Sequence, residues 1–292
     1  MPLPDGLSRA DGQAAAPITQ DQRALLLRIV RDAAREAIMP RFRALDPSQI
    51  ATKSGPADLV TLADTEAEAL IRERVGAAWP EAAVLGEEAV AADPSLRLQM
   101  GTADPCVIVD PVDGTWNFAK GLSLFGVLLA VLRGGKPVWG LLYDPVMDDW
   151  IEAAVGEPAR LVSADGRERI LRSSREARPG RLTGYMPLGL YRREERARIV
   201  AEFPDFLRIT SLRCALHEYR MVAQGHAEFA LSGPTPHPWD HAAGVLAVQG
   251  AGGVARFLDG SPYDAARPKG VLLAAGSEAA WESLARRFAF LA

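Results

Sequence analysis

The chain has 292 residues, of which 48% are hydrophobic and 24% are charged, and its formal net charge is −4 at pH 7. This composition is ordinary for a soluble globular protein, and the length suits one large domain or two half-domains with ample core. The slight negative charge and the lack of a basic block argue against a nucleic-acid-binding surface, so no nucleic-acid partner is expected.

The N-terminal segment, the hydropathy and the cysteines indicate the cellular location of the protein. Residues 1–17 lack the charged start and apolar core of a signal peptide, and they predict a flexible N-terminal segment. No stretch approaches the length of a transmembrane helix, so no membrane partner is expected. Cys106 and Cys214 are too few for a disulfide framework, and both stand in apolar surroundings typical of core thiols. We therefore expect a cytoplasmic protein.

The N-terminal quarter predicts two helices separated by a linker. Thr19 and Gln22 have the spacing of a capping box, and apolar residues then recur at helical spacing up to Pro40. Residues 41–60 are expected to form a linker, with a loop at residues 53–56, and a second helix should follow at about 63–78. Four arginines on the first helix are expected to form a solvated face: Arg23, Arg28, Arg31 and Arg35.

The stretch at residues 107–118 carries the strongest chemical signal. A short β-branched run predicts a buried strand that ends at an Asp-Pro turn and is followed by an Asp-Gly turn. Asp110 and Asp113 therefore leave one strand end close together, and Thr115 adds a hydroxyl. Carboxylate oxygens are the ligands that Mg²⁺ prefers. A surface turn with solvated carboxylates is the ordinary alternative for such a stretch taken alone.

Three further acidic positions have a structural and a functional interpretation. Glu87 and Glu88 follow a short apolar strand and a glycine, where a solvated pair is common. Asp64 lies in the first turn of the second helix, where it complements the helix dipole. Asp240 follows a proline-rich loop and opens a helix, which suits an N-cap. The acidic stretches at Glu87-Glu88 and at Asp240 are also expected at the same centre as Asp110 and Asp113.

The string Asp-Pro-Val-Asp-Gly-Thr-Trp-Asn-Phe at residues 110–118 resembles the signature of the inositol monophosphatase family of Mg²⁺-dependent, lithium-sensitive phosphatases. Gly-Glu-Glu at 86–88 and Trp-Asp-His-Ala-Ala-Gly at 239–244 match two more family motifs, in the right order. The resemblance covers roughly residues 18–290.

The resemblance implies an α/β fold with alternating α-β-α-β-α layers. An antiparallel N-terminal sheet and a smaller mixed C-terminal sheet are expected, in subdomains of about 18–156 and 157–290. Short strands that alternate with helices after residue 157 agree with a mixed layer. A homodimer is implied too.

The family motifs also imply a ligand set and a catalytic set. Two or three Mg²⁺ ions are expected, and their ligands are Glu87, Asp110, the Val112 carbonyl, Asp113 and Asp240. Asp64 is expected to accept a hydrogen bond from Thr115, so that together they orient the attacking water. Glu88 supports the ligand beside it, and Lys53 matches a loop lysine near the metal site.

Substrate contacts are expected from three segments. The amides of Gly114 and Thr115 are expected to bind phosphate oxygens. Further candidates are Ala215 and His217 on a helix at about 214–224, and Ser232 and His237 on the proline-rich loop. This chain has Arg213 and Cys214 where the family has a glycine- and alanine-rich segment, and it has no acidic residue between Phe229 and Asp240. Inositol-specific members carry one there, which argues against inositol monophosphate as the physiological substrate.

The predicted function is Mg²⁺-dependent hydrolysis of a small phosphate monoester by metal-activated water. The substrate class stays open between inositol-phosphate-like, sugar-phosphate and histidinol-phosphate compounds, and fructose bisphosphate or NADP are further possibilities. The alternative is a binding protein on a phosphatase scaffold, with a regulatory role in transcription or ribosome assembly.

Overall fold

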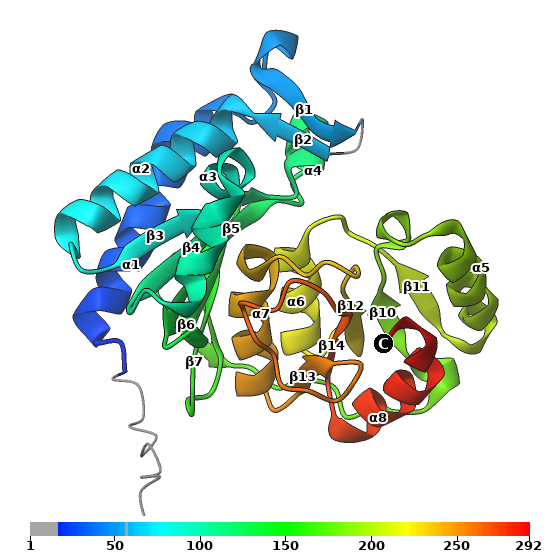
Figure 1. The fold of residues 1–292 in the computed structure, drawn as a ribbon. Helices are drawn as coiled ribbons and strands as arrows, with labels where there is room; N and C mark the ends of the chain where they lie inside the picture. Colours follow the sequence, from blue (N-terminus) through cyan, green and yellow to red (C-terminus); the bar gives the residue numbers. More distant parts are fainter. Residues whose placement is uncertain (1–16, 56–57) are drawn as a thin grey trace, which may run out of the picture.

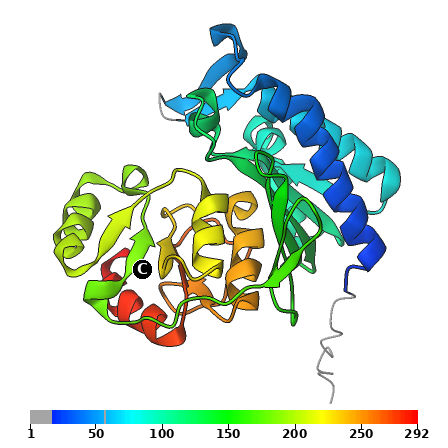
Figure 2. The same ribbon diagram turned by 180° about the vertical axis from the view of Figure 1, so that it is seen from behind.

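A computed structural model describes residues 17–55 and 58–292. The segment predicted to be flexible therefore lies outside the described residues, except for Pro17. The chain forms five alternating layers, helix–sheet–helix–sheet–helix, as the resemblance implied (Figure 1, and from behind in Figure 2). In the part of the chain that the structure describes, no helix is both long and apolar enough to cross a bilayer.

The first layer consists of α1 (Gln20–Ala33) and α2 (Leu62–Ala78). Both helices begin with a capping box, at Thr19 and at Thr61, which confirms the predicted start of α1. A π-helical turn, Ala34–Ile38, and a 3-10 turn, Met39–Arg41, extend α1. The prediction of a solvated arginine face is wrong for Arg23, which is buried and bonded to Glu157 at 2.7 Å.

The predicted linker contains a hairpin. A 3-10 turn, Pro47–Gln49, leads into β1 (Ile50–Gly55), which pairs antiparallel with β2 (Asp58–Thr61). The prediction of a loop at residues 53–56 is therefore wrong for residues 53–55, which belong to β1. The Lys-Ser-Gly-Pro stretch is unsuited to a regular helix and to a central strand, but a two-stranded ribbon has no central strand.

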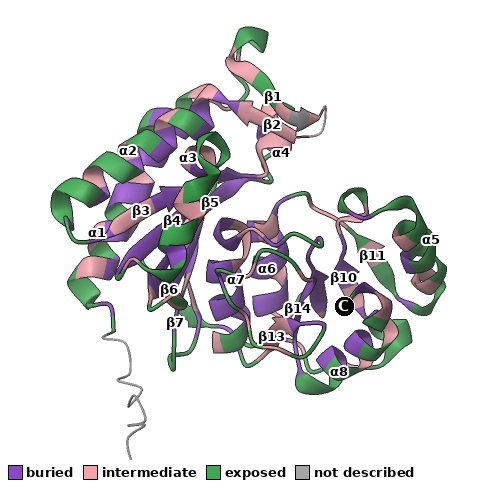
Figure 3. Ribbon diagram, viewed as in Figure 1, coloured by how far each residue is buried: buried purple, intermediate pink, exposed green. Residues whose placement is uncertain are grey.

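The second layer is a seven-stranded sheet in the order β3-β4-β5-β6-β7-β8-β9. The apolar runs at residues 124–132, 138–143 and 150–155 predict an antiparallel meander, which β5, β6 and β7 confirm. The antiparallel pairing continues to β4 on one side and to β9 on the other, while β3 joins β4 in parallel. Both faces of its central strands are covered, so they are buried throughout (Figure 3). The strands are β3 (Ala83–Gly86), β4 (Cys106–Asp113), β5 (Gly126–Arg133), β6 (Lys136–Asp144), β7 (Asp149–Ala154), β8 (Arg160–Val162) and β9 (Glu168–Ile170). The sheet thus extends past the expected subdomain boundary at residue 156.

Strand β4 departs from the prediction at Pro111. It was expected to end at the Asp-Pro turn, but it continues to Asp113, and its register against β5 shifts between Asp110 and Asp113. Proline lacks the N–H that a regular ladder needs, and a bulge removes that requirement. The bulge presents Asp110 and Asp113 from one continuous strand.

The polar residues and the two prolines between positions 89 and 105 predict a loop, but this stretch is largely helical. It contains α3 (Glu87–Ala92) and a 3-10 helix, Pro94–Gly101. Glu87 and Glu88 therefore open a helix. Glycine at 86 and proline at 94 bound α3, which is too short to show an apolar period.

The middle helical layer packs between the two sheets. It consists of α6 (Ala215–Ala223) and α7 (Pro238–Gly250), and its core is continuous with one face of each sheet. A short α4 (Thr115–Ala119) follows β4. Close packing against α7 requires glycine twice: a Cβ at Gly140 would lie 2.7 Å from the Ala243 Cα, and one at Gly244 would lie 2.2 Å from the Tyr219 ring.

The fourth layer is a mixed five-stranded sheet in the order β11-β10-β12-β14-β13, as expected for the second half. The outer helices, α5 (Arg193–Glu202) and α8 (Glu278–Arg287), form the last layer, and α8 packs on a separate core with this sheet. The strands are β10 (Thr183–Tyr185), β11 (Arg208–Thr210), β12 (Phe229–Leu231), β13 (Val254–Phe257) and β14 (Leu272–Ala275). Short 3-10 turns lie at Pro179–Arg181, Leu188–Leu190, Phe203–Asp205 and Ala289–Leu291.

Packing of α6 on α7 generates a stability prediction. Gly244→Ala should lower the free energy of unfolding by about 1–3 kcal/mol, because the methyl group overlaps the Tyr219 ring. The matched control is Gly76→Ala in α2, which meets nothing within 4 Å and should gain about 0.5–1 kcal/mol. Urea unfolding of both variants checks this, and equal effects of the two substitutions would contradict the packing argument.

Candidate active site

Three carboxylates from distant parts of the chain meet between the first sheet and the middle helices. Glu87 opens α3, Asp110 lies at the bulge of β4, and Asp240 lies in the first turn of α7. One oxygen from each lies within 4.8 Å of the others. Part of the predicted ligand set is therefore assembled by the fold.

The cluster concentrates negative charge where water is scarce. Burial raises the pKa of Asp110 and of Asp240 well above the usual carboxyl range, and the charge of Glu87 adds to both shifts. Oxygen donors that are held close and poorly solvated suit a hard divalent cation. The residues present therefore fit Mg²⁺.

Lys53, on β1, supplies a positive charge to this end of α3. Its Nζ donates to Glu87 Oε1 and to Glu88 Oε1, both at 2.7 Å. Burial opposes the charge of Lys53, but the two carboxylates outweigh it and raise the pKa of the ammonium. Burial also raises the pKa of Glu88 to about 7. The structure thus brings Lys53 and Glu88 to the cluster.

Asp113 lies beside the cluster but outside the set of three. Its Oδ2 accepts the Leu216 amide at 2.5 Å and lies 3.2 Å from the Cys214 thiol, so the start of α6 holds it. Burial raises the pKa of Asp113 to about 6, and the Leu216 amide opposes the rise. The charge of Asp113 in turn raises the pKa of Asp110 and of Asp240.

The predicted contact between Thr115 and Asp64 is present. The Thr115 hydroxyl lies 2.9 Å from Asp64 Oδ1 and 3.0 Å from the Val112 carbonyl oxygen. A hydroxyl has one proton, so it donates to one of them at a time. Asp64 also accepts the Thr61 amide at 2.9 Å, so it serves as a helix cap and as a partner of Thr115 together. Burial raises the pKa of Asp64 to about 6.

Glu68 supports the site, although the sequence reasoning missed it. Its carboxylate accepts the amides of Glu88 at 2.8 Å and Ala89 at 2.9 Å, which anchors the start of α3. A Cβ at Gly86 would lie 2.1 Å from Glu68 Cδ, so only glycine leaves room there. The signal was available, because Glu68 falls on the buried face of α2, four residues after Asp64.

Arg97 also borders the site, although the sequence reasoning did not identify it, because it lies in the stretch that was predicted to be a loop. Its Nη2 lies 3.3 Å from the Pro236 carbonyl, on the loop that leads into α7. His237, on that loop, stacks on Trp239 with ring centroids 5.0 Å apart. Burial lowers the pKa of His237, while the charge of Glu87 opposes this. A lone arginine in a polar stretch carries no sequence signal for this position.

The other predicted substrate contacts lie at the starts of helices, on the loop before α7 and at the end of β6. Gly114, with φ +88°, begins α4, and a Cβ there would lie 2.6 Å from the Leu124 carbonyl. Ala215 begins α6, and its amide bonds to Asp113. Ser232 is only 6% exposed, and its hydroxyl donates to the Gly233 carbonyl and accepts the Leu272 amide. His217 faces the end of β6, where its Nε2 lies 4.0 Å from Asp144.

Asn117 ties the segment after β4 to the loop before α6. Its Nδ2 donates to the carbonyls of Leu124 and Leu212, both at 2.8 Å, and the side chain is buried. The segment 114–117 and residues 212–215 therefore form one rigid border of the site. The motif contained Asn117, but no role for it was inferred.

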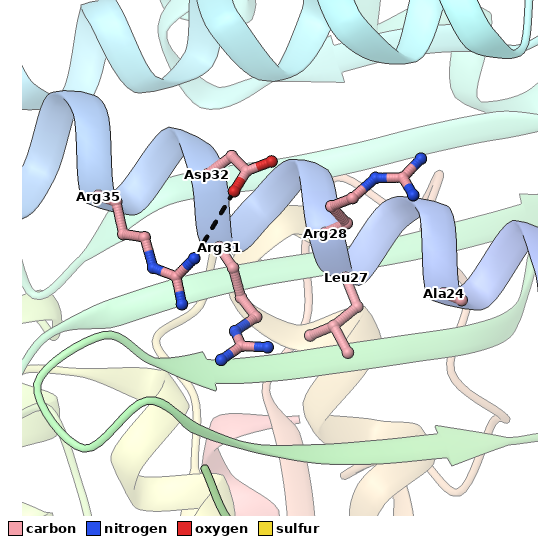
Figure 4. Close-up of a pocket in the computed structure, with 6 residues that line it drawn as sticks. All are labelled: Ala24, Leu27, Arg28, Arg31, Asp32 and Arg35. Carbon is pink, nitrogen blue, oxygen red and sulfur yellow. Dashed lines mark ion pairs between the residues drawn. The ribbon is translucent and has the colours of Figure 1, made fainter. Parts of the chain in front are cut away.

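A hollow on the outer face of α1 lies apart from this cluster (Figure 4). Two of the three arginines that line it have acidic partners: Arg31 pairs with Asp148 at 2.5 Å, and Arg35 with Asp32 at 3.8 Å. The hollow brings no catalytic group together, so the acidic cluster is the candidate site.

Comparison with known proteins shows similarity to phosphatases. The chain is 29% identical over 246 residues to inositol monophosphatase 1 of Solanum lycopersicum, which covers 82% of this chain and 86% of that protein. It is 30% identical over 257 residues to the histidinol-phosphatase of Streptomyces coelicolor, covering 81% and 87%. A solved structure of an IMPase from Thermotoga maritima superposes with a TM-score of 0.76 at 23% identity, covering 93% of this chain and 98% of that one.

The family model described as the inositol monophosphatase family matches residues 21–290, which is nearly the whole chain. The match includes every segment that contributes to the acidic cluster. The chain therefore belongs to the inositol monophosphatase family of metal-dependent phosphomonoesterases.

Proposed function

We propose that this protein hydrolyses a small phosphate monoester with Mg²⁺ held by Glu87, Asp110 and Asp240, and with Asp113 and the Val112 carbonyl as further ligands. The convergence of the three carboxylates within 4.8 Å carries this proposal. The raised pKa values of Asp110 and Asp240 support it, because burial and neighbouring negative charges raise them and a bound cation would offset both effects.

Hydrolysis of a phosphate monoester is limited by the negative charge that the nucleophile must approach. Bound Mg²⁺ supplies charge neutralisation and makes water more acidic. The side chains of Thr115 and Asp64 orient the attacking water. When the Thr115 hydroxyl donates to Asp64, its lone pairs can accept a hydrogen bond from the attacking water and so orient it, and the Val112 carbonyl stays available as a ligand.

The phosphate is proposed to bind at the start of α4, against the amides of Gly114 and Thr115. The left-handed backbone at Gly114 turns the chain sharply there. The ammonium of Lys53 pairs with Glu87 and Glu88, so a positive charge also lies beside the carboxylate cluster. These features favour an anionic group beside the carboxylate cluster.

The proposed substrate is a sugar phosphate or a histidinol-phosphate-like ester rather than inositol monophosphate. Residues 230–239 hold no acidic side chain that could accept from an inositol hydroxyl, and the Ser232 hydroxyl is engaged with backbone. The relatives' names include both an inositol monophosphatase and a histidinol-phosphatase. Because the carboxylates of the site are all present, catalysis is favoured over a purely regulatory binding role.

Phosphate release from a substrate panel tests this proposal. The panel holds histidinol phosphate, fructose 1,6-bisphosphate, glycerol 2-phosphate and inositol 1-phosphate, each with Mg²⁺, without it, and with added Li⁺. Mg²⁺-dependent turnover that Li⁺ inhibits is expected, with inositol 1-phosphate among the poorer substrates. No turnover of any compound, together with no metal binding, would refute the proposed function.

Replacing one ligand should abolish activity without unfolding the protein. Asp240→Asn keeps the shape of the side chain but removes its charge, so kcat/KM should fall about a hundredfold or more. The circular dichroism spectrum should not change. Asp165→Asn, in an exposed turn between β8 and β9, is the matched control and should keep full activity. Retained activity in Asp240→Asn would contradict the ligand assignment.

Metal binding should release protons. Asp110 and Asp240 have pKa values well above the usual carboxyl range, so at low pH the cation competes with protons for them. Mg²⁺ affinity should therefore rise from about pH 6 to about pH 8. Calorimetry in two buffers with different ionisation enthalpies measures the protons released. A buffer-independent enthalpy would show that the ligands are already ionised.

A further inference from the structure

The helix that carries Glu87 begins without a cap of its own. Helix α3 starts at Glu87, directly after β3, and its N-cap residue, Gly86, has no side chain that could accept the first amides. The helix has only 6 residues, so its first turn depends on partners from elsewhere in the chain. The direction in which Glu87 points therefore depends on the group that holds these amides.

Glu68, on α2, takes the place of the missing cap. Its Oε2 accepts the Glu88 amide at 2.8 Å, and its Oε1 accepts the Ala89 amide at 2.9 Å. Both carboxylate oxygens are thus bonded to one helix start, and the side chain is only 3% exposed. Burial raises the pKa of Glu68, and the two amides oppose the rise, because they bond to the ionised form. Bonds to an ionised acceptor are stronger than bonds between neutral groups.

The carboxylate of Glu68, and not the backbone, requires glycine at position 86. Gly86 has φ −104° and ψ 165°, an extended conformation that any residue adopts. A Cβ there would lie 2.1 Å from Glu68 Cδ and 2.2 Å from Glu68 Oε2. A side chain at position 86 and the bonded carboxylate therefore exclude each other. The two residues form a matched pair.

This pair lies directly behind one of the three clustered carboxylates. The backbone of Glu87 lies between two residues that contact Glu68, while one of its side-chain oxygens lies within 4.8 Å of oxygens from Asp110 and Asp240. Asp110 and Asp240 belong to β4 and α7. A rotation of the start of α3 would therefore move Glu87 away from the other two.

We propose that Glu68 is a positioning residue for metal binding and that, with the space left by Gly86, it sets the direction of the Glu87 carboxylate. This inference rests on the proposed function and deepens it, because it makes the affinity for Mg²⁺ depend on a residue outside the ligand set. Loss of Glu68 leaves all the ligands in the chain but loosens the turn that carries Glu87.

Glu68→Ala and Gly86→Ala test the pair from its two sides. The first removes the acceptor, and the second displaces it by overlap. In both variants, calorimetric titration with Mg²⁺ alone should show an affinity about tenfold or more below that of the wild type. The amides of Glu88 and Ala89 should also exchange with solvent faster, as NMR measures. Glu68→Gln keeps one acceptor oxygen and nearly the same shape, so its loss of affinity should be smaller.

The double variant Glu68→Ala/Gly86→Ala measures whether the two residues act together. Each single substitution removes the same two hydrogen bonds, so their effects should not add. The double variant should bind Mg²⁺ within about twofold of the weaker single variant. Additive losses would show that the two residues act independently and would contradict the matched pair.

Kinetics and controls separate positioning from a general loss of structure. In Glu68→Ala, the Mg²⁺ concentration for half-maximal phosphate release should rise about tenfold, while kcat at saturating Mg²⁺ stays within about threefold. Thr19→Ala removes the cap of α1, which lowers stability away from the site, and it should leave Mg²⁺ affinity unchanged. Glu73→Gln removes an exposed charge from α2 and should also bind Mg²⁺ as the wild type does.

The titrations distinguish this inference from the proposed function. If the wild type binds Mg²⁺ and the folded Glu68→Ala, Glu68→Gln and Gly86→Ala variants bind it equally well, this inference is overturned and the proposed function stands. An equal loss of affinity in Thr19→Ala would also overturn it, since stability alone would then account for the effect. If the wild type binds no Mg²⁺, the proposed function itself fails.

Discussion

Repulsion between carboxylates that are held close together is the main constraint on this structure. Glu87, Asp110 and Asp240 come from three separate segments, and the fold holds their oxygens within 4.8 Å of one another. Such an arrangement is unfavourable by itself, because like charges face one another where solvation is reduced. The free energy that holds it together comes from the hydrophobic layers above and below, which cover both faces of the first sheet.

Backbone amides hold several of the acidic groups around the cluster. Glu68 accepts the first amides of α3, the Leu216 amide fixes Asp113, and the capping box at Thr61 fixes Asp64. Helix starts serve this purpose well, because their amides lack partners within the helix and favour negative charge. The amides at the start of a helix therefore also hold an acidic side chain in place.

The layers position the site as well as stabilise it. The bulge in β4 presents Asp110 and Asp113 on one continuous strand, and glycine at 140 and 244 lets α7 approach the sheet and α6 closely enough to bring Asp240 across. Asn117 then joins the segment after β4 to the loop before α6. Small shifts in any of these packed contacts would move a carboxylate, since close-packed interiors yield little.

Local patterns in the sequence determined the long helices, the meander and the acidic motifs, because periodicity, capping and turn residues act over a few positions. The three motifs also determined the family. Only the tertiary structure decided that Asp113 points to α6, that Glu68 and Arg97 support the site, that Ser232 is engaged with backbone, and that Arg213 lies over Trp116. Those facts depend on contacts between segments far apart in the chain, and no local pattern encodes which partner a side chain meets.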